Sequence, residues 1–192
     1  MLINNVLDRY LHGMPRGSGS TEQDYAVLYA VTRGMQAEKI LEIGTNKGFS
    51  AVVLCQAVID NGKIPTLWTV DNWVVGNPVM AKQLFEETGF DGYVKMITGD
   101  SKSILPILFN DIGEVDLIFI DGNHSIEAVS CDRNNCQNYT DCLIFHDTGF
   151  GDYVYLKELI NEWDILSIPT RYVEGNGHLV GITIAVRKGR KK

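Results

Sequence analysis

The stretch Lys39-Ile-Leu-Glu-Ile-Gly-Thr-Asn-Lys-Gly-Phe-Ser50 decides the fold of this chain. Residues 39–43 are mostly apolar and predict a short buried strand. The two glycines that follow predict a tight turn, and apolar residues at helical spacing over Gly48–Asp60 predict a helix. Glu42 lies at the strand end, just before the first glycine, where an acid suits a ligand with a cationic amino group. Strand, glycine turn and helix together predict a ligand-binding loop.

Strand-like and helix-like segments continue to alternate along the chain, which predicts an α/β fold with a doubly wound, mostly parallel sheet. The further predicted strands are Thr66–Val70, Tyr93–Ile97, Val115–Ile120 and Asp141–Phe145. The further predicted helices are Pro78–Thr88, Lys102–Phe109, Ser125–Asn138 and Tyr153–Trp163. The last two strand patterns, Ile165–Tyr172 and Leu179–Val186, have no helix between them. They predict a long hairpin, so the final strand should run antiparallel to the others.

The length of 192 residues fits one domain, which we expect to span residues 1–192. Residues 1–38 should form a helical cap or lid, 39–187 the ligand-binding core and 188–192 a basic tail. In the cap segment, Ser20-Thr-Glu-Gln23 has the spacing of a capping box.

The composition narrows the class of protein. A net charge of -7 argues against a nucleic-acid binder. We expect no membrane span and no secretory signal, and the four cysteines without a CxxC pair indicate reduced thiols in a cytoplasmic protein. An oligomer is compatible with the sequence.

Polar residues and glycines follow each predicted parallel strand, at the edge where open sheets bind ligands. Asp71 after the second strand suits the two hydroxyls of a ribose, and Asp100 with Ser101 after the third suits an adenine edge. Any one of these residues is compatible with a simple turn or helix cap. Their repetition at successive strand ends favours a nucleoside site. The candidate cofactor-binding residues are Glu42, Gly44, Thr45, Asn46, Gly48, Ser50, Asp71, Asn72, Asp100, Ser101 and Asp121.

The alternative ligand for this predicted nucleoside site is a nicotinamide dinucleotide. Gly44-Thr-Asn-Lys-Gly48 lacks the G-x-G-x-x-G spacing, and Glu42 would lie unfavourably close to a phosphate. A phosphate-binding G-K-[ST] motif is absent as well. We therefore predict S-adenosylmethionine as the cofactor. A nucleotide-binding module without methyl transfer remains the alternative.

Three motifs, Leu41–Ser50, Phe119–His124 and Ile144–Thr148, resemble the class I S-adenosylmethionine-dependent methyltransferases. Within that class the chain is most similar to small O-methyltransferases of the macrocin-type sugar methyltransferase group, over roughly residues 20–187. The resemblance implies a Rossmann-like methyltransferase fold with a seven-stranded sheet and a reversed last strand. It also implies that the Gly44–Gly48 loop holds the methionine part of the cofactor. Asn46 stands where the family often has a middle glycine.

The predicted reaction centre lies after the fourth and fifth strands. Carboxylates and imidazoles there suit Mg²⁺ or another divalent cation, and the predicted metal ligands are Asp121, His146 and Asp147. In related metal-dependent O-methyltransferases, acids match Asp121 and Asp147, while His146 stands where an acid is usual. By the same resemblance His124 is the general base, so the catalytic candidates are His124, Asp121 and Asp147.

The same residues are also compatible with purely structural roles, and the sequence does not decide between the two interpretations. His146 is compatible with a hydrogen-bonded strand end, Asp147 with a turn cap and His124 with a helix cap. The predicted reaction is methylation of a hydroxyl oxygen of a small molecule, with or without a metal. Trp73, Phe150 and Tyr153 are candidates for an acceptor pocket.

Overall fold

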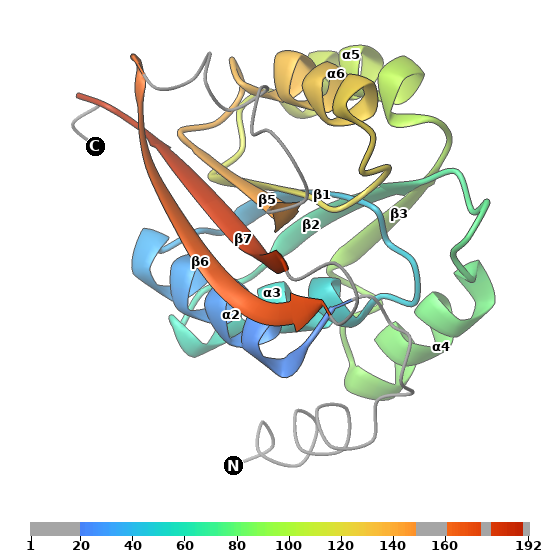
Figure 1. Ribbon diagram of the computed structural model, residues 1–192. Helices are drawn as coiled ribbons and strands as arrows, with labels where there is room; N and C mark the ends of the chain where they lie inside the picture. Colours follow the sequence, from blue (N-terminus) through green and yellow to red (C-terminus); the bar gives the residue numbers. More distant parts are fainter. Residues whose placement is uncertain (1–19, 149–160, 174–177, 190–192) are drawn as a thin grey trace.

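A computed structural model of the chain describes residues 20–148, 161–173 and 178–189. In these residues one sheet contains seven strands, in the order β3-β2-β1-β4-β5-β7-β6 (Figure 1). The strands are β1 (Lys39–Ile43), β2 (Thr66–Asp71), β3 (Val94–Thr98), β4 (Leu117–Ile120), β5 (Cys142–Thr148), β6 (Trp163–Val173) and β7 (His178–Arg187). The first five pair in parallel, and β7 runs antiparallel to both β5 and β6. The predicted fold class and reversed last strand are confirmed.

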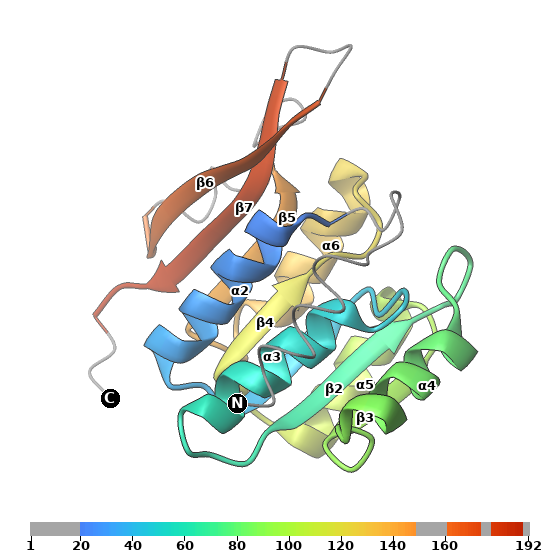
Figure 2. The same ribbon diagram turned by 90° about the horizontal axis from the view of Figure 1, so that it is seen from below.

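Helices cover both faces of this sheet (Figures 1 and 2). One face carries α2 (Glu22–Met35), α3 (Phe49–Asp60) and α4 (Pro78–Thr88), and the other carries α5 (Ser101–Ile112) and α6 (Ile126–Cys136). Successive residues of each strand therefore enter two different cores. Leu117 and Phe119 pack towards α2 and α3, whereas Ile118 and Ile120 pack towards α5 and α6. Burial on both faces explains why the strands are nearly continuous apolar runs.

The chain reverses its direction of travel across the sheet between β1 and β4. From β1 it moves outward through β2 to β3, then returns to place β4 on the other side of β1. Such a point leaves a crevice at the carboxyl ends of the two strands, because their connecting loops turn away from each other. The fold therefore predicts where a ligand enters.

Two predictions need correction. The capping box of α2 begins at Thr21 rather than Ser20: the Thr21 hydroxyl accepts from the Asp24 N–H, and the Asp24 carboxylate accepts from the Thr21 N–H. The third helical position is thus taken by Asp24 on the buried face and not by exposed Gln23. Trp163, predicted as the end of a helix, is the first residue of β6.

Several other predictions lie outside the described residues. These are the lid over residues 1–19, most of the helix 153–163, Phe150, Tyr153 and residues 190–192 of the basic tail. In the part of the chain that the structure describes, no helix combines the length and apolar character needed to cross a bilayer.

Candidate functional site

A cavity of about 840 Å³ opens where the carboxyl ends of β1 to β5 meet. This volume is typical of a site for a cofactor or small ligand. Loops after β1 to β4 contribute to its wall, and β5 contributes His146 and Asp147 from the strand itself. The predicted site residues that line the cavity are Gly44, Asn46, Asp71, Asn72, Asp100, Ser101, Asp121, His124, His146 and Asp147.

The β1–α3 loop needs its glycines for close approach. Gly44 has φ +97°, and a Cβ there would overlap the backbone carbonyl oxygen of Asp121. Gly48 has φ +86°, and its Cβ would lie 2.7 Å from the ring of Phe85. Asn46, at the place of the usual middle glycine, also adopts a left-handed conformation with φ 48°. Asparagine tolerates this region better than most residues, so the loop keeps its shape without the third glycine.

Asp71 orders two loops at once. One carboxylate oxygen accepts from the Asn46 N–H at 2.8 Å and the other from the Trp73 N–H at 2.6 Å. A carboxylate offers about four lone-pair positions, so capacity remains for ligand hydroxyls in the cavity. Trp73 itself packs against the core and donates from Nε1 to Thr98, and it is not part of the cavity wall.

Asp100 and Ser101 lie at the start of α5. Asp100 is the N-cap, accepting from the Lys102 N–H at 2.9 Å, while its side chain still borders the cavity. The Ser101 hydroxyl donates to Asp132 of α6 at 2.7 Å. Burial raises the pKa of the Asp132 carboxyl to about 6, against the lowering effect of the Ser101 hydrogen bond. A second acid therefore stands beside the predicted adenine end.

Four predicted cofactor residues lie behind the cavity wall, namely Glu42, Thr45, Gly48 and Ser50. Glu42 is fully buried and accepts a 2.5 Å hydrogen bond from Thr69, which also pairs with Thr45. Burial raises the pKa of the Glu42 carboxyl to about 8, although hydrogen bonds from Ser50 and Thr69 lower it. Glu42 thus supports the loop from within. Thr45 and Ser50 instead line a small adjoining pocket of about 20 Å³ that shares Gly44, Asn46 and Asp121 with the main cavity.

The ends of β4 and β5 bring four titratable side chains together, as predicted. His146 Nδ1 lies 2.7 Å from Asp121 Oδ1 and 3.7 Å from Asp147 Oδ1. His124 Nε2 lies 3.9 Å from carboxylate oxygens of both Asp121 and Asp147. His124 is about half exposed (51%), whereas the His146 side chain is 2% exposed. Of the two histidines, His124 is therefore the one more open to an incoming molecule.

His146 is surrounded by negative charge. Burial by itself lowers the pKa of the ring, but the charge of Asp121 and the interactions with Asp121 and Asp24 outweigh it and raise the pKa to about 10. Asp24 responds in the opposite sense: burial acts to raise its pKa, and the contacts with His146 and Thr170 bring it down to about 2. In the absence of another cation, the imidazolium balances these acids.

The donor set of this cluster fits a divalent cation. Ligand atoms of Asp121, His124 and His146 lie within 4.8 Å of one another. Both ring nitrogens of His146 are buried and make no hydrogen bond of good geometry, although carboxylates face them. Asp147 borders the same point through its contacts with both histidines. A cation bound there would take the place of the proton on His146.

The structure decides the helix-cap alternative for His124. Ser125, not His124, is the N-cap of α6, with its hydroxyl accepting from the Ala128 N–H. The helix-cap interpretation of His124 is therefore wrong.

Asp147 has φ 51°, a strained conformation for a residue other than glycine. In the described residues, left-handed non-glycine residues gather at this edge of the sheet, at Asn46, Trp73 and Asp147, with Gln36 at a helix end. Such strain clusters at functional sites.

Two acids near the cavity were missed by the sequence reasoning. Asp24 and Asp132 are 1% and 3% exposed, and each contacts a predicted site residue. A signal was present for both, because each shares a helix face with buried apolar residues: Leu28 follows Asp24 by four positions, and Cys136 follows Asp132 likewise. An acid on the apolar face of a helix needs a partner in the interior.

The chain matches the family model described as "Methyltransferase domain" over residues 41–148. It is 32% identical over 112 residues to a catechol O-methyltransferase of Niastella koreensis, and 29% identical over 110 residues to one of Mycobacterium tuberculosis. These matches cover 58% and 57% of the chain, but only 48% and 47% of the relatives, so the chain spans about half of their length.

Solved structures have the same fold. The O-methyltransferase TomG of Streptomyces achromogenes, in complex with SAM, aligns with a TM-score of 0.70 and 20% identity, covering 98% of this chain and 89% of that one. An O-methyltransferase of Bacillus cereus, in complex with SAH, aligns with a TM-score of 0.69 and 19% identity, covering 96% and 90%.

Proposed function

Because the chain belongs to the methyltransferase domain family, we propose that it transfers the methyl group of S-adenosylmethionine to a hydroxyl oxygen of a small molecule. The observation that carries this proposal is the charge of the cavity. Aspartates from successive strand ends and from α6 line it, and Lys102 is the only lysine or arginine in the described part of its wall. Such a wall favours a sulfonium and an ammonium group and disfavours a pyrophosphate.

The cofactor would lie across the β1/β4 crevice. The Gly44–Gly48 loop would hold the methionine part, with the small pocket at Thr45 and Ser50 beside it. Asp71 would accept hydrogen bonds from the ribose, and Asp100 with Ser101 would border the adenine. Glu42 would act on the cofactor through the loop that it supports, since it is fully buried.

The reactive methyl group would then face His124, Asp121 and Asp147. His124 is proposed as the base because it is the exposed member of the cluster and borders both acids. Asp121, His146 and Asp147 are proposed to hold a divalent cation, with Mg²⁺ the first choice for the carboxylates. Asp121 and His146 belong, with His124, to the donor group within 4.8 Å, and Asp147 Oδ1 lies 3.7 Å from His146 Nδ1. A cation there lowers the pKa of an acceptor hydroxyl and fixes its position. Alignment of the acceptor oxygen with the sulfonium methyl would supply much of the rate.

A small-molecule acceptor is supported by the curated relatives, two of which are named for catechol. A cytoplasmic location is supported by the state of Cys55, Cys131, Cys136 and Cys142, which are all free thiols. Both statements are part of the proposal.

Calorimetry with S-adenosylhomocysteine tests the cofactor assignment. Asp71→Ala should weaken binding at least about tenfold, because charged hydrogen bonds to the ribose are lost. Asp91→Ala, a change at an exposed acid outside the cavity wall, is the matched control and should bind like the wild type. Equal affinity of the Asp71→Ala variant and the wild type would contradict the assignment.

A second experiment separates a transferase from a binding module. A panel of hydroxylated small molecules is incubated with methyl-labelled cofactor, with and without a chelator. Transfer to any acceptor supports the enzyme, whereas tight binding without transfer across the panel favours the module. Transfer that is unchanged in excess chelator would remove the metal and leave the transferase.

A further inference from the structure

Helix α2 contributes one charged side chain, that of Asp24, to the surroundings of the reaction centre. Asp24, at the first turn of α2, is 1% exposed, and its Oδ2 lies 3.4 Å from Nε2 of His146 at the end of β5. No predicted motif includes Asp24. Its helix lies against β6 and β7, on the same face of the sheet as α3 (Figures 1 and 2).

Capping alone does not account for this position. The Asp24 carboxylate accepts from the Thr21 N–H at 2.6 Å, and the Asp24 N–H donates to the Thr21 hydroxyl oxygen at 3.3 Å, which completes the capping box. The carboxylate also lies 2.8 Å from the Thr21 hydroxyl, which donates to it. A capping carboxylate can do this at the surface, where water solvates its charge. Burying an ionised carboxylate is unfavourable unless a positive group compensates it. The ring of His146 is the group that faces Asp24 and can carry that charge.

The two ring nitrogens of His146 thereby face different carboxylates. Nδ1 faces Asp121 on the cavity side, and Nε2 faces Asp24 on the side of α2. The edge contact with Phe119, at 6.2 Å between ring centroids and 71° between planes, bounds the ring on a third side. Rotation of the ring by half a turn would put Cδ2 and Cε1 where Nδ1 and Nε2 now lie, and a carboxylate at Nε2 opposes this rotation because a ring carbon cannot donate to it as an N–H does.

The same carboxylate also reaches β6. The Thr170 hydroxyl donates to Asp24 Oδ1 in a very short hydrogen bond. Asp24 thus joins the start of α2, strand β6 and the end of β5 at one buried point. Displacement of α2 would release the ring of His146.

We propose that Asp24 is a positioning residue for His146: it holds the imidazole so that Nδ1 is presented to Asp121 and the cavity, and it couples the docking of α2 to the geometry of the reaction centre. This inference deepens the proposed function and depends on it for the role of His146. Asp24 touches neither cofactor nor acceptor in this scheme, so it acts through the histidine.

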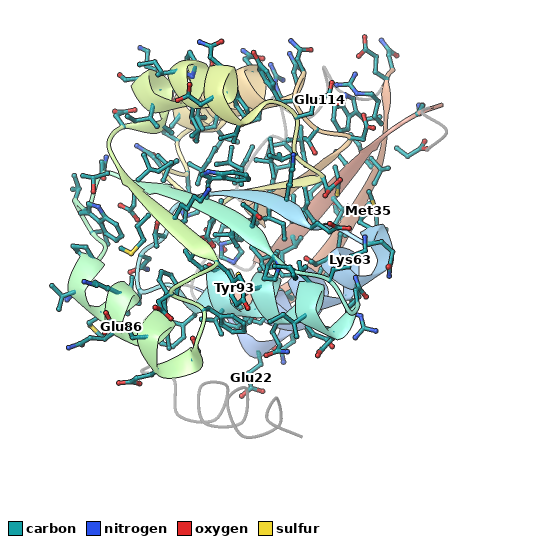
Figure 3. All side chains as sticks on the ribbon, turned by 180° about the vertical axis from the view of Figure 1, so that it is seen from behind. Glu22, Met35, Lys63, Glu86, Tyr93 and Glu114 are labelled. Carbon is teal, nitrogen blue, oxygen red and sulfur yellow. The ribbon has the colours of Figure 1, made fainter. Side chains whose placement is uncertain are left out.

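Asp24→Asn is the test, with Glu22→Gln as the matched control. Both change an acid of the same helical turn to its amide, but Glu22 is exposed and projects away from the sheet (Figure 3). Long-range nitrogen–proton NMR of the imidazole rings, assigned with His146→Gln, should give a single set of His146 signals in the wild type, with both ring nitrogens protonated. Asp24→Asn should shift that pattern or split it into two. In the steady state, kcat should fall about tenfold or more while KM for S-adenosylmethionine stays within about threefold.

Unchanged His146 signals in Asp24→Asn, or equal effects of Glu22→Gln, would overturn the proposal. If Asp24→Asn fails to fold, Thr170→Val carries the test, because it removes one donor to Asp24 and leaves the capping box intact. It should shift the same His146 signals, and no shift would again overturn the proposal. The NMR readout needs neither cofactor nor metal. A wild type that binds no S-adenosylmethionine would therefore end the proposed function without deciding the role of Asp24.

Discussion

At the scale of single residues, Glu42 has a role that can be tested through pH. It is fully buried, and burial raises the pKa of its carboxyl from 4.5 to about 8. Between these two pH values the folded state binds a proton that the unfolded state has released. Stability should therefore fall as pH rises from about 4.5 to about 8, on the order of a few kcal/mol.

Glu42→Gln removes this titration while keeping a polar group for Thr69. The free energy of unfolding, measured by urea denaturation at several pH values, should lose that part of its pH slope. Glu38→Gln, at an exposed acid four residues earlier and just before β1, should keep the wild-type slope. Parallel pH profiles for the wild type and Glu42→Gln would show that Glu42 is not the titrating group.

At the scale of elements, the β1–α3 loop depends on close approach of its backbone to β4. A methyl group at Gly44 would meet the backbone of Asp121 and the Gly122 nitrogen at 3.0 Å, and neither can rotate away as a side chain could. Gly44→Ala should therefore destabilise the protein by more than about 3 kcal/mol and abolish binding of S-adenosylhomocysteine. Both are measurable by urea denaturation and calorimetry.

Gly62→Ala is the control that separates the cost of a positive φ from the cost of a steric overlap at Cβ. Gly62 also has a positive φ, +75°, but nothing lies within 4 Å of its Cβ position. The Gly62→Ala variant should lose only about 1 kcal/mol of its free energy of unfolding and should bind S-adenosylhomocysteine like the wild type. Similar losses at the two glycines would mean that backbone strain, and not the approach to β4, governs the loop.

The elements were predictable where the local pattern carries the information. Pro78–Thr88 was predicted with the bounds that the structure has, because Pro78 at the first turn and Gly89 at the end are local signals. The directions of side chains were less predictable. Glu42 and Asp71 both belong to strand ends, yet one is fully buried and the other borders the cavity. The pleat and the neighbouring strands decide this, and a single sequence does not give their register.

The contact of Asp24 with His146 could not be predicted at all from local pattern. It needs β7 to be inserted between β5 and β6, and α2 to pack against that part of the sheet. Both are long-range arrangements that no turn or cap signal encodes. Asp24 was therefore missed although the reaction centre around His146 was found.

At the scale of the whole molecule, the two edges of the sheet differ in function. Loops at the carboxyl edge line the cavity, whereas the α3–β2 loop of residues 61–65 lies at the opposite edge. There Lys63 is held by the Gln36 carbonyl and Glu38, beside Met35 at the end of α2 (Figure 3). A ligand at the carboxyl edge has no contact with this loop.

Hydrogen exchange with and without S-adenosylhomocysteine should reveal this difference between the two edges of the sheet. Ligand at 100 times Kd stabilises the folded state by about 2.7 kcal/mol, so amides that exchange only through global unfolding should all slow by a similar factor. Amides that exchange by local opening should slow only where the ligand binds, in residues 44–48, 71–76, 99–101 and 121–124. Residues 61–65 should exchange unchanged, and Asp71→Ala should remove the local protection. Protection of residues 61–65 equal to that of the four carboxyl-edge loops would contradict a ligand site confined to the carboxyl edge.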